Sequence, residues 1–337
     1  MTTIRDLAKA AGVNVSTVSR ALTDNPKISM ETRARIKELA KELGYRPNGL
    51  ARSLKDHSTH ILGLIIPNIL NPSTPGVVRG VEDAAMEKGY IVVLCNADED
   101  ISKEKTYIKT LQSMWVDGIL MSTASDDSRY LLDIKEQSPP IILLVRQFEE
   151  YFDAVCVDNK QSARKATEYL IGTGCRRIAI VNGPQELNLY RDRCQGYLSA
   201  LAQAGIEADE QLIWNFEDQT GDAFYKGTRD RLESGLRPDA ILAASGPQGP
   251  AGPHILRAVK EFGLKVPGEV SIMGFDDLEA NAITDPPISI ISQPFYTIGY
   301  MAAKRLIEKI EDKDGRTDGT TFTTILNTEF MIRGTTK

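Results

Sequence analysis

The sequence has few of the residues that catalysis and metal binding use. Its 337 residues include three histidines and four cysteines. The cysteines are Cys95, Cys156, Cys175 and Cys194. They are far apart and show no metal-ligand spacing, and each lies in or beside an apolar stretch, so we expect buried free thiols in a reducing cytoplasm. We therefore expect no metal site.

Nucleotide-binding signatures are also absent from the sequence. There is no GxxxxGK[ST] motif, and Gly246, Gly249 and Gly252 follow the spacing GxxGxxG rather than GxGxxG. The prolines between them remove amide donors that a pyrophosphate would need. The three histidines form no cluster with cysteines or carboxylates, and no nucleophile elbow occurs. We expect no catalytic residue and no cofactor, while a sugar-modifying enzyme remains an alternative for a chain with alternating strands and helices.

Long apolar runs are missing as well. No run approaches the roughly 18 apolar residues of a membrane span, and the N-terminus begins a helix rather than a secretion signal. With 42% apolar and 26% charged residues, the composition is that of a globular protein outside the membrane. The length exceeds what one ordinary core needs, so we expect two or three domains.

The stretch TIRDLAKAAGVNVSTVSRAL, residues 3–22, has the pattern of two short helices joined by a tight turn at Gly12. Asn14 is a candidate N-cap of the second helix, whose Val15, Ser16 and Arg20 lie off the buried stripe. A methyl-bearing side chain, a hydroxyl and a guanidinium on one exposed helix suit the reading of a DNA major groove. A small three-helix packing unit remains the alternative.

The charge of the chain is divided unevenly. Residues 1–60 hold eleven Lys and Arg against six Asp and Glu, whereas the whole chain has a net charge of −6. A basic head on an acidic body suits a protein in which only the head contacts the phosphates of DNA. Cationic side chains there gain affinity because they release the counterions condensed on DNA.

Two further segments complete the head. A third helix is expected over 29–43, ending at Gly44, so that residues 1–47 form a small domain. Residues 48–60 follow as a hinge and linker, with a weak helix at 49–55 that Asn48 could cap. A helix this short is marginal in water, so it needs a partner surface.

From residue 61 onward, short Val, Ile and Leu runs alternate with amphipathic stretches. Such continuous runs mark strands buried on both faces of a parallel sheet. One series starts with ILGLII (61–66) and a second with RRIAIV (176–181), which predicts two sheets. Helices are expected near 76–88, 103–114, 128–136, 160–172, 191–204, 221–233, 254–262 and 295–310. The expected fold class is an all-α head followed by an α/β body of two doubly wound parallel-sheet lobes.

An ordered set of motifs runs through the whole chain. They are TVSRAL (17–22), ETRARI (31–36), LGYRPNGLARSL (43–54), ILGLIIPNILNP (61–72), VRGVEDAA (78–85), VDGIL (116–120), VDN (157–159), Arg193-x-x-Gly196, VPGEVSIMGFDD (266–277) and Gln293-Pro294. With these motifs the chain resembles the lactose/galactose repressor family of bacterial transcription regulators.

The resemblance implies a homodimer, or a higher oligomer, with a body like type I periplasmic sugar-binding proteins. The body would span residues 61–337. Its first lobe would hold about 61–160 and 291–319, and its second about 161–290 and 320–337.

The resemblance also assigns roles in the head. Val15 would touch a thymine methyl, Ser16 would donate or accept a hydrogen bond, and Arg20 would contact a guanine. Leu54 aligns with the hinge leucine that wedges into the minor groove at the centre of a pseudo-palindromic operator. The other positions assigned to DNA, including phosphate and capping contacts, are Thr3, Asn14, Thr17, Ser19, Asn48 and Ala51.

In the body, the resemblance places a small polar effector in the cleft between the lobes, at the carboxyl ends of the strands. The residues assigned to it are Asn71, Ser73, Thr74, Arg146, Arg193, Ser245 and Asp276. Arginine and aspartate together suit a sugar or sugar derivative, whose buried hydroxyls need donors and acceptors. The expected function is a repressor under allosteric control by this effector, with a corepressor-dependent or activating regulator as the alternative.

Two departures from the family pattern lie in the expected pocket. Ser73 and Thr74 stand where relatives often have two aromatic residues that stack on a sugar ring. Ser245-Gly246 replaces an Asn-Asp pair, and the connection 246–253 is about three residues longer, with prolines that delay the next helix to about His254. These changes make a simple neutral hexose a less suitable effector for this pocket.

Overall fold

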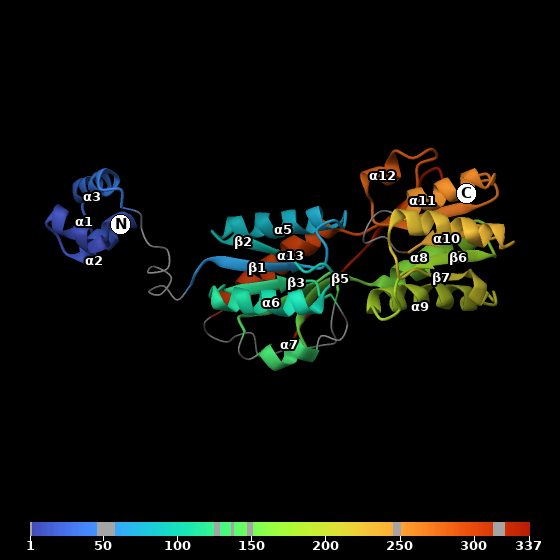
Figure 1. Ribbon diagram of the computed structural model, residues 1–337, viewed down its shortest axis with the longest axis horizontal. Helices are drawn as coiled ribbons and strands as arrows, with labels where there is room; N and C mark the ends of the chain where they lie inside the picture. The colour runs from blue at the N-terminus through green and yellow to red at the C-terminus, as the bar shows by residue number, and fades with distance from the viewer. Residues whose placement is uncertain are drawn as a thin grey trace. The chain divides into compact units, whose positions relative to one another are not determined.

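Figure 1 shows the computed structural model, which describes residues 2–45, 58–124, 129–135, 138–146, 151–244, 251–312 and 321–337. The chain divides into two compact units, a head (Met1–Thr59) and a body (His60–Lys337). Several predictions lie outside the described residues. They concern Asn48, Ala51 and Leu54, the helix expected at 49–55, Ser245, and most of the connection after Ser245.

Three helices form the head: α1 (Ile4–Ala11), α2 (Val15–Leu22) and α3 (Met30–Glu42). Local sequence fixes their ends. Thr3 and Asp6 form a capping box at the start of α1, Gly12 ends that helix in the left-handed conformation, and Ser29 caps α3. Apolar side chains from all three helices form one core, which includes Leu7, Ala8, Ala11, Val18, Ala21, Ile36 and Ala40.

The body contains two six-stranded sheets within its described residues, one for each lobe. In spatial order the first sheet is β11 (Thr323–Leu326), β5 (Asp153–Val157), β4 (Ile141–Leu144), β3 (Gly118–Met121), β1 (Ile61–Ile66) and β2 (Ile91–Asn96). All of its strand pairs are parallel. Helices α5 (Thr74–Glu87) and α13 (Phe295–Glu311) cover one face, and α6 (Ile101–Ser113) and α7 (Arg129–Ile134) cover the other (Figure 1).

The second sheet repeats this plan. Its order is β12 (Glu329–Met331), β10 (Ser289–Ser292), β9 (Ser271–Phe275), β8 (Ala240–Ala243), β6 (Ile178–Asn182) and β7 (Ile213–Asn215), with β12 antiparallel to β10. Its helices are α8 (Asn159–Gly172), α9 (Asn188–Gln203), α10 (Gly221–Glu233), α11 (Ala251–Glu261) and the short α12 (Glu279–Ala282), with a 3-10 turn at Glu210–Leu212. Strands β1, β3, β4, β5, β6, β8 and β9 are buried almost throughout, as the apolar runs predicted.

The fold class predicted from the sequence is confirmed, with two corrections to its details. Residues 321–326 belong to the first lobe and not to the second, because β11 pairs with β5 along Thr323–Leu326. Helix α11 starts at Ala251 rather than near His254, because Pro253 lies in its first turn, where the missing amide hydrogen costs no helical hydrogen bond.

The described chain crosses between the lobes at three places, namely between β5 and α8, between β10 and α13, and between β11 and β12. In both sheets the strand order reverses beside the first strand of the series, at β1/β3 and at β6/β8. Ligands of doubly wound sheets bind at the carboxyl ends of strands near such a reversal. No helix of the described part of the chain is long and apolar enough to span a membrane.

Candidate functional site

Helix α2 of the head has one buried and one exposed side. Val18 and Ala21 are buried in the core of the head. Val15 is 40% exposed, and Ser16 and Arg20 are also exposed. The three side chains predicted to read bases therefore share the solvent side of one helix.

The other predicted DNA contacts of the head differ in their surroundings. Asn14 occupies the N-cap position of α2, but its side chain forms no capping hydrogen bond with the described residues, contrary to expectation. Thr17 and Ser19 are half-buried. Thr3 is exposed, and its hydroxyl donates to Asp6 at 2.7 Å. Thr3 thus has a structural role at the start of α1 whatever its contact with DNA.

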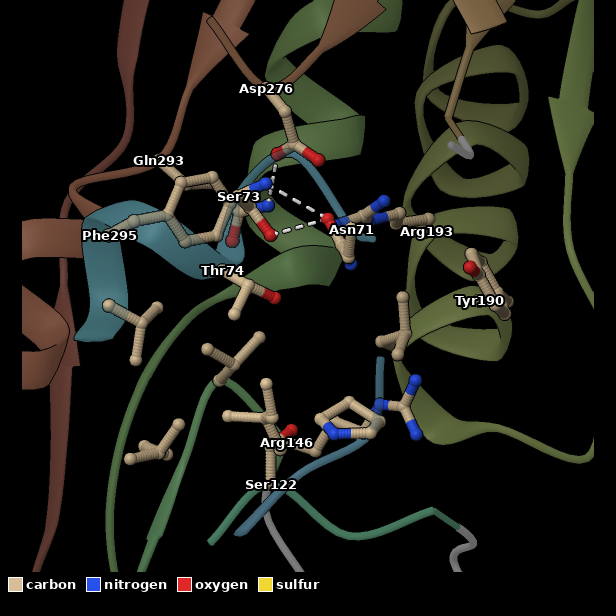
Figure 2. Close-up of a pocket in the computed structure, with 16 residues that line it drawn as sticks. Asn71, Ser73, Thr74, Ser122, Arg146, Tyr190, Arg193, Asp276, Gln293 and Phe295 are labelled. Carbon is tan, nitrogen blue, oxygen red and sulfur yellow. Dashed lines mark hydrogen bonds between the residues drawn. The ribbon is translucent and has the colours of Figure 1, made fainter. Parts of the chain in front are cut away.

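Six of the seven residues predicted for the effector site line one pocket of the body, shown in Figure 2. They are Asn71, Ser73, Thr74, Arg146, Arg193 and Asp276. Arg146 and the 71–74 segment belong to the first lobe, and Arg193 and Asp276 belong to the second. The pocket therefore lies between the lobes, as the family resemblance implied.

Asp276 and Arg193 form the polar wall of the second lobe. Asp276 follows β9 with a φ of 69°, and its carboxylate accepts a hydrogen bond from Gln293 Nε2 at 2.6 Å. Burial raises the pKa of the Asp276 carboxyl group, and the positive charge of Arg193 opposes that shift. An acceptor is thereby held beside a donor at the pocket surface.

Arg193 is 5% exposed and is held on three sides. Its Nε donates to Asn159 Oδ1 and its Nη1 to the carbonyl of Ala244, both at 2.8 Å. Its guanidinium lies 4.1 Å from the centre of the Phe275 ring. Burial lowers the pKa of Arg193 while the charge of Asp276 raises it. These contacts hold the Arg193 side chain in one orientation at the pocket surface.

Arg146, in the first lobe, is 6% exposed and is also held in place. Its Nη1 and Nη2 donate to the two carboxylate oxygens of Glu99 at 3.0 and 3.1 Å, and Nη1 also donates to the carbonyl of Thr123 at 2.6 Å. Val145 before it has a φ of 65°, which is strained for a β-branched residue. Strain of this kind persists only where the surroundings fix the backbone.

The 71–74 segment forms a small polar wall before α5. Asn71 Oδ1 accepts from the Ser73 amide at 3.0 Å and from its hydroxyl at 2.7 Å, as Figure 2 shows. The Thr74 hydroxyl donates to the carbonyl of Asn68 at 2.9 Å. Because Ser73 and Thr74 have short side chains, the wall leaves space at the position where the two aromatic residues of many relatives stack on a sugar ring.

Four functional candidates in the pocket were missed by the sequence analysis: Ser122, Tyr190, Gln293 and Phe295. Ser122 follows β3, so the rule that ligands lie at strand carboxyl ends could have found it. Tyr190 precedes Arg193 by one helical turn, which places both on the same side of α9. Gln293 lies in a motif that carried the resemblance, and Phe295 follows it.

The remaining lining of the pocket is mostly apolar and includes Ile66, Val77, Leu144 and Leu189. A mostly apolar pocket with a few fixed polar groups is typical of small-molecule sites. Its cavity volume is about 70 Å³. Among the described residues, no group of three or more His, Cys, Asp or Glu side chains could hold a metal ion.

Two family models match the chain. Residues 3–48 match the model described as bacterial regulatory proteins of the lacI family. Residues 59–331 match the model described as periplasmic binding proteins and sugar binding domain of the LacI family. The chain belongs to the LacI family. Its head is therefore the DNA-binding domain of a LacI-family transcription regulator, and its body is the sugar-binding domain.

Individual relatives of this LacI-family chain match it from end to end. A ribose operon repressor of Halalkalibacterium halodurans is 35% identical and covers 100% of this chain and 98% of its own length. The transcriptional repressor CytR of Escherichia coli K12 is 32% identical, with 99% of this chain and 96% of CytR covered. The structure of the regulator CelR in complex with cellobiose has a TM-score of 0.73 and 29% identity, over 99% of this chain and 100% of the other. All three are named as regulators of transcription.

Proposed function

We propose that this chain is a dimeric, operator-binding repressor whose DNA affinity is set by a small sugar-like effector in the interlobe pocket. The observation that carries the proposal is the convergence of six predicted effector residues on one pocket of the sugar-binding domain. The exposed side of α2 supplies the matching DNA-reading surface.

The chemistry of α2 supports sequence-specific binding. The guanidinium of Arg20 can donate two hydrogen bonds to a guanine, and the Val15 methyl groups can contact a thymine methyl. Three base-reading side chains cover only a few base pairs, so one head would recognise a half-site. Two heads joined in a homodimer then read a pseudo-palindrome with both half-sites.

The chemistry of the pocket favours a small polyhydroxylated ligand. Asp276 offers acceptors and the two arginines offer donors, which is what neighbouring hydroxyls need once they leave water. The name of one relative, a ribose operon repressor, suggests ribose as a first candidate for the effector.

The proposed mechanism is thermodynamic linkage. An effector that contacts both lobes prefers one relative orientation of them, and that preference changes how well the paired heads fit the operator. In this proposal the pocket binds its ligand and carries out no reaction on it, in line with the relatives that are named as repressors. The regulator acts in the cytoplasm, where its operator is.

The test uses the full chain and two measurements. Thermal shifts with D-ribose, other pentoses, hexoses, cellobiose, ribonucleosides, sugar phosphates and polyols should identify an effector that raises the Tm. Fluorescence anisotropy on DNA from upstream of the gene should then show specific binding that this compound weakens. Strengthened binding would instead identify a corepressor. Equal affinity for that DNA and for scrambled DNA would overturn the operator-binding proposal.

A further inference from the structure

Glu104 is a carboxyl group buried in the core of the first lobe. Its side chain is 0% exposed, and it lies on the side of α6 that also buries Ile108 and Leu111. Its Oε2 accepts a hydrogen bond from the Ala124 amide at 2.7 Å, and the Tyr130 hydroxyl donates to its Oε1. Burying an ionisable group in an apolar core costs free energy of folding. Glu104 itself is not one of the residues proposed to contact the effector.

A short segment connects Glu104 to the pocket. Ser122 lines the pocket and donates its amide to the carbonyl of Ile65 at 3.0 Å. The carbonyl of the following residue, Thr123, accepts a hydrogen bond from Arg146 Nη1 at 2.6 Å. The next amide, that of Ala124, donates to Glu104. Three consecutive residues thus link the sheet, the pocket arginine and the buried carboxyl group.

We propose that Glu104 is a positioning residue for the pocket: it fixes the 122–124 segment from behind and through it the guanidinium of Arg146. The inference deepens the proposed function, since the pocket it acts on is the proposed effector site. Glu99 holds Arg146 from one side through a bidentate pair, and Thr123 holds it from the other. The position of Thr123 depends on the hydrogen bond from the following amide to Glu104.

The charges around Glu104 give this contact a dependence on pH. The charged and titratable groups that face it are Arg146, Glu99, Lys105 and Tyr130. Burial raises the pKa of Glu104 to about 7, against the Ala124 hydrogen bond and the charge of Arg146, which lower it. The ionised carboxylate of Glu104 accepts from two donors, the Ala124 amide and the Tyr130 hydroxyl. Protonation below about pH 7 makes this group neutral and weakens it as an acceptor, so the 122–124 segment is held less firmly there.

The test is made on the full chain without ligand. The rate at which phenylglyoxal modifies Arg146 is measured by mass spectrometry and divided by the rate for exposed Arg20, which removes the pH dependence of the reagent. Hydrogen exchange of the Ala124 amide is measured in parallel. Glu104→Ala should raise both the rate ratio and the exchange about tenfold, because a lost hydrogen bond allows local opening.

Asp153 supplies the matched control. It is another buried carboxylate of the first sheet, paired with Arg305 and Lys309 at 3.3 Å each. Asp153→Ala should leave the Arg146 ratio within twofold of the original protein. An equal rise in both variants would mean general loosening of the lobe and would overturn the proposal.

Glu104→Gln keeps the test decisive if the alanine variant does not fold. Glutamine still accepts from Ala124 but does not titrate, so the Arg146 ratio should become flat between pH 6 and 8, while the original protein shows a fall with rising pH. Identical pH profiles would overturn the proposal. Because no ligand is present, this outcome is independent of whether any sugar binds, and a negative ligand screen would count against the proposed function alone.

Discussion

Arg20 is the residue on which base discrimination by the head should depend most. Replacement by alanine removes a guanine contact from each half-site, so binding to the operator should weaken by about 1–3 kcal/mol per half-site while discrimination at that base pair is lost. Anisotropy titrations against the operator and its single-base variants measure this. Arg5→Ala, which changes an exposed arginine on α1, is the control and should retain base preference. Uniform weakening on all DNA, with a reduced salt slope, would identify Arg20 as a phosphate contact instead.

Asp276 should be needed for the effector and dispensable for DNA. Asp276→Asn keeps the size of the side chain but removes its charge, so we expect a loss of about 2–5 kcal/mol in effector binding and an operator affinity within a few-fold of the original. Calorimetry and anisotropy measure the two. The neighbouring Asp277 pairs with Arg333 at 2.7 Å and is not among the described pocket residues, so Asp277→Asn should bind effector normally. Loss of operator binding with Asp276→Asn would indicate a structural role.

Glu104 should also affect stability as a function of pH. Its pKa of about 7 in the folded protein exceeds the value near 4.3 of an unfolded chain, so the folded state binds the proton more tightly. The stability that this contributes is fully present below about pH 4.3 and is lost as pH rises through about 7, on the order of 4 kcal/mol in total. The difference in urea unfolding free energy between the original protein and Glu104→Gln should follow this curve. A difference that is constant between pH 5 and 8 would contradict it.

The sequence predicted some pocket residues well and others not at all. Arg193 and Asp276 lie in family motifs, and a residue that matches a motif is expected at the same place in the fold as in the family. Glu104 could not be predicted, because a glutamate on an amphipathic helix normally faces water, and only the tertiary partners Ala124 and Tyr130 make its burial possible. Likewise, Asn14 has the extended backbone of an N-cap residue, but its side chain forms no capping hydrogen bond within the described part of the chain, and the sequence does not reveal this orientation of the side chain.

Among the elements, α5 and α13 make a close contact that bears on the pocket. The two helices lie side by side on the first sheet (Figure 1), and a Cβ at Gly80 would lie 2.1 Å from the carbonyl oxygen of Tyr296. The residues just before or at their N-termini, Ser73, Thr74, Gln293 and Phe295, line the pocket. The contact between the helices therefore sets the distance between two pocket walls.

Gly80→Ala should separate these helices and destabilise the body by about 1–3 kcal/mol, because the clash is with backbone and not with a flexible side chain. Effector affinity should fall as well. Gly172→Ala is the control, since a Cβ there meets no heavy atom within 4 Å among the described residues, and alanine at the end of α8 should be neutral or slightly stabilising. Urea unfolding measures both. Equal stability of the two variants would show that the helices can move apart without cost.

The errors at this scale have physical causes. The sequence of a short strand such as Thr323–Leu326 does not indicate which sheet the strand joins, so the sequence predicts the wrong lobe for β11. Its partner β5 lies far away in the sequence. The sequence predicts too late a start for α11, because a proline such as Pro253 breaks a helix at an interior position but is compatible with the first turn.

At the scale of the whole molecule, the pocket belongs to neither lobe alone. The described chain crosses between the lobes at three places, and Gln293, in one of these crossings, donates to Asp276. A ligand that binds Asp276 on one side and Arg146 on the other is therefore sensitive to the relative position of the lobes. Such a ligand can shift a conformational equilibrium only by its difference in affinity for the two states.

This linkage leads to a quantitative prediction for the full chain. If saturation of the two pockets of the dimer changes the dissociation constant for the operator by some factor, the operator must change the product of the two effector dissociation constants by the same factor, and typical factors are about 5–150-fold for each coupled pair of sites. Calorimetric titrations of the effector with and without saturating operator duplex measure the second factor, and anisotropy with and without saturating effector measures the first. A scrambled duplex is the control and should leave effector affinity almost unchanged. This equality holds for any coupling mechanism at fixed stoichiometry, so unequal factors would mean that the effector or the operator also changes the association of the subunits. A factor of one in both titrations would contradict allosteric control by this effector.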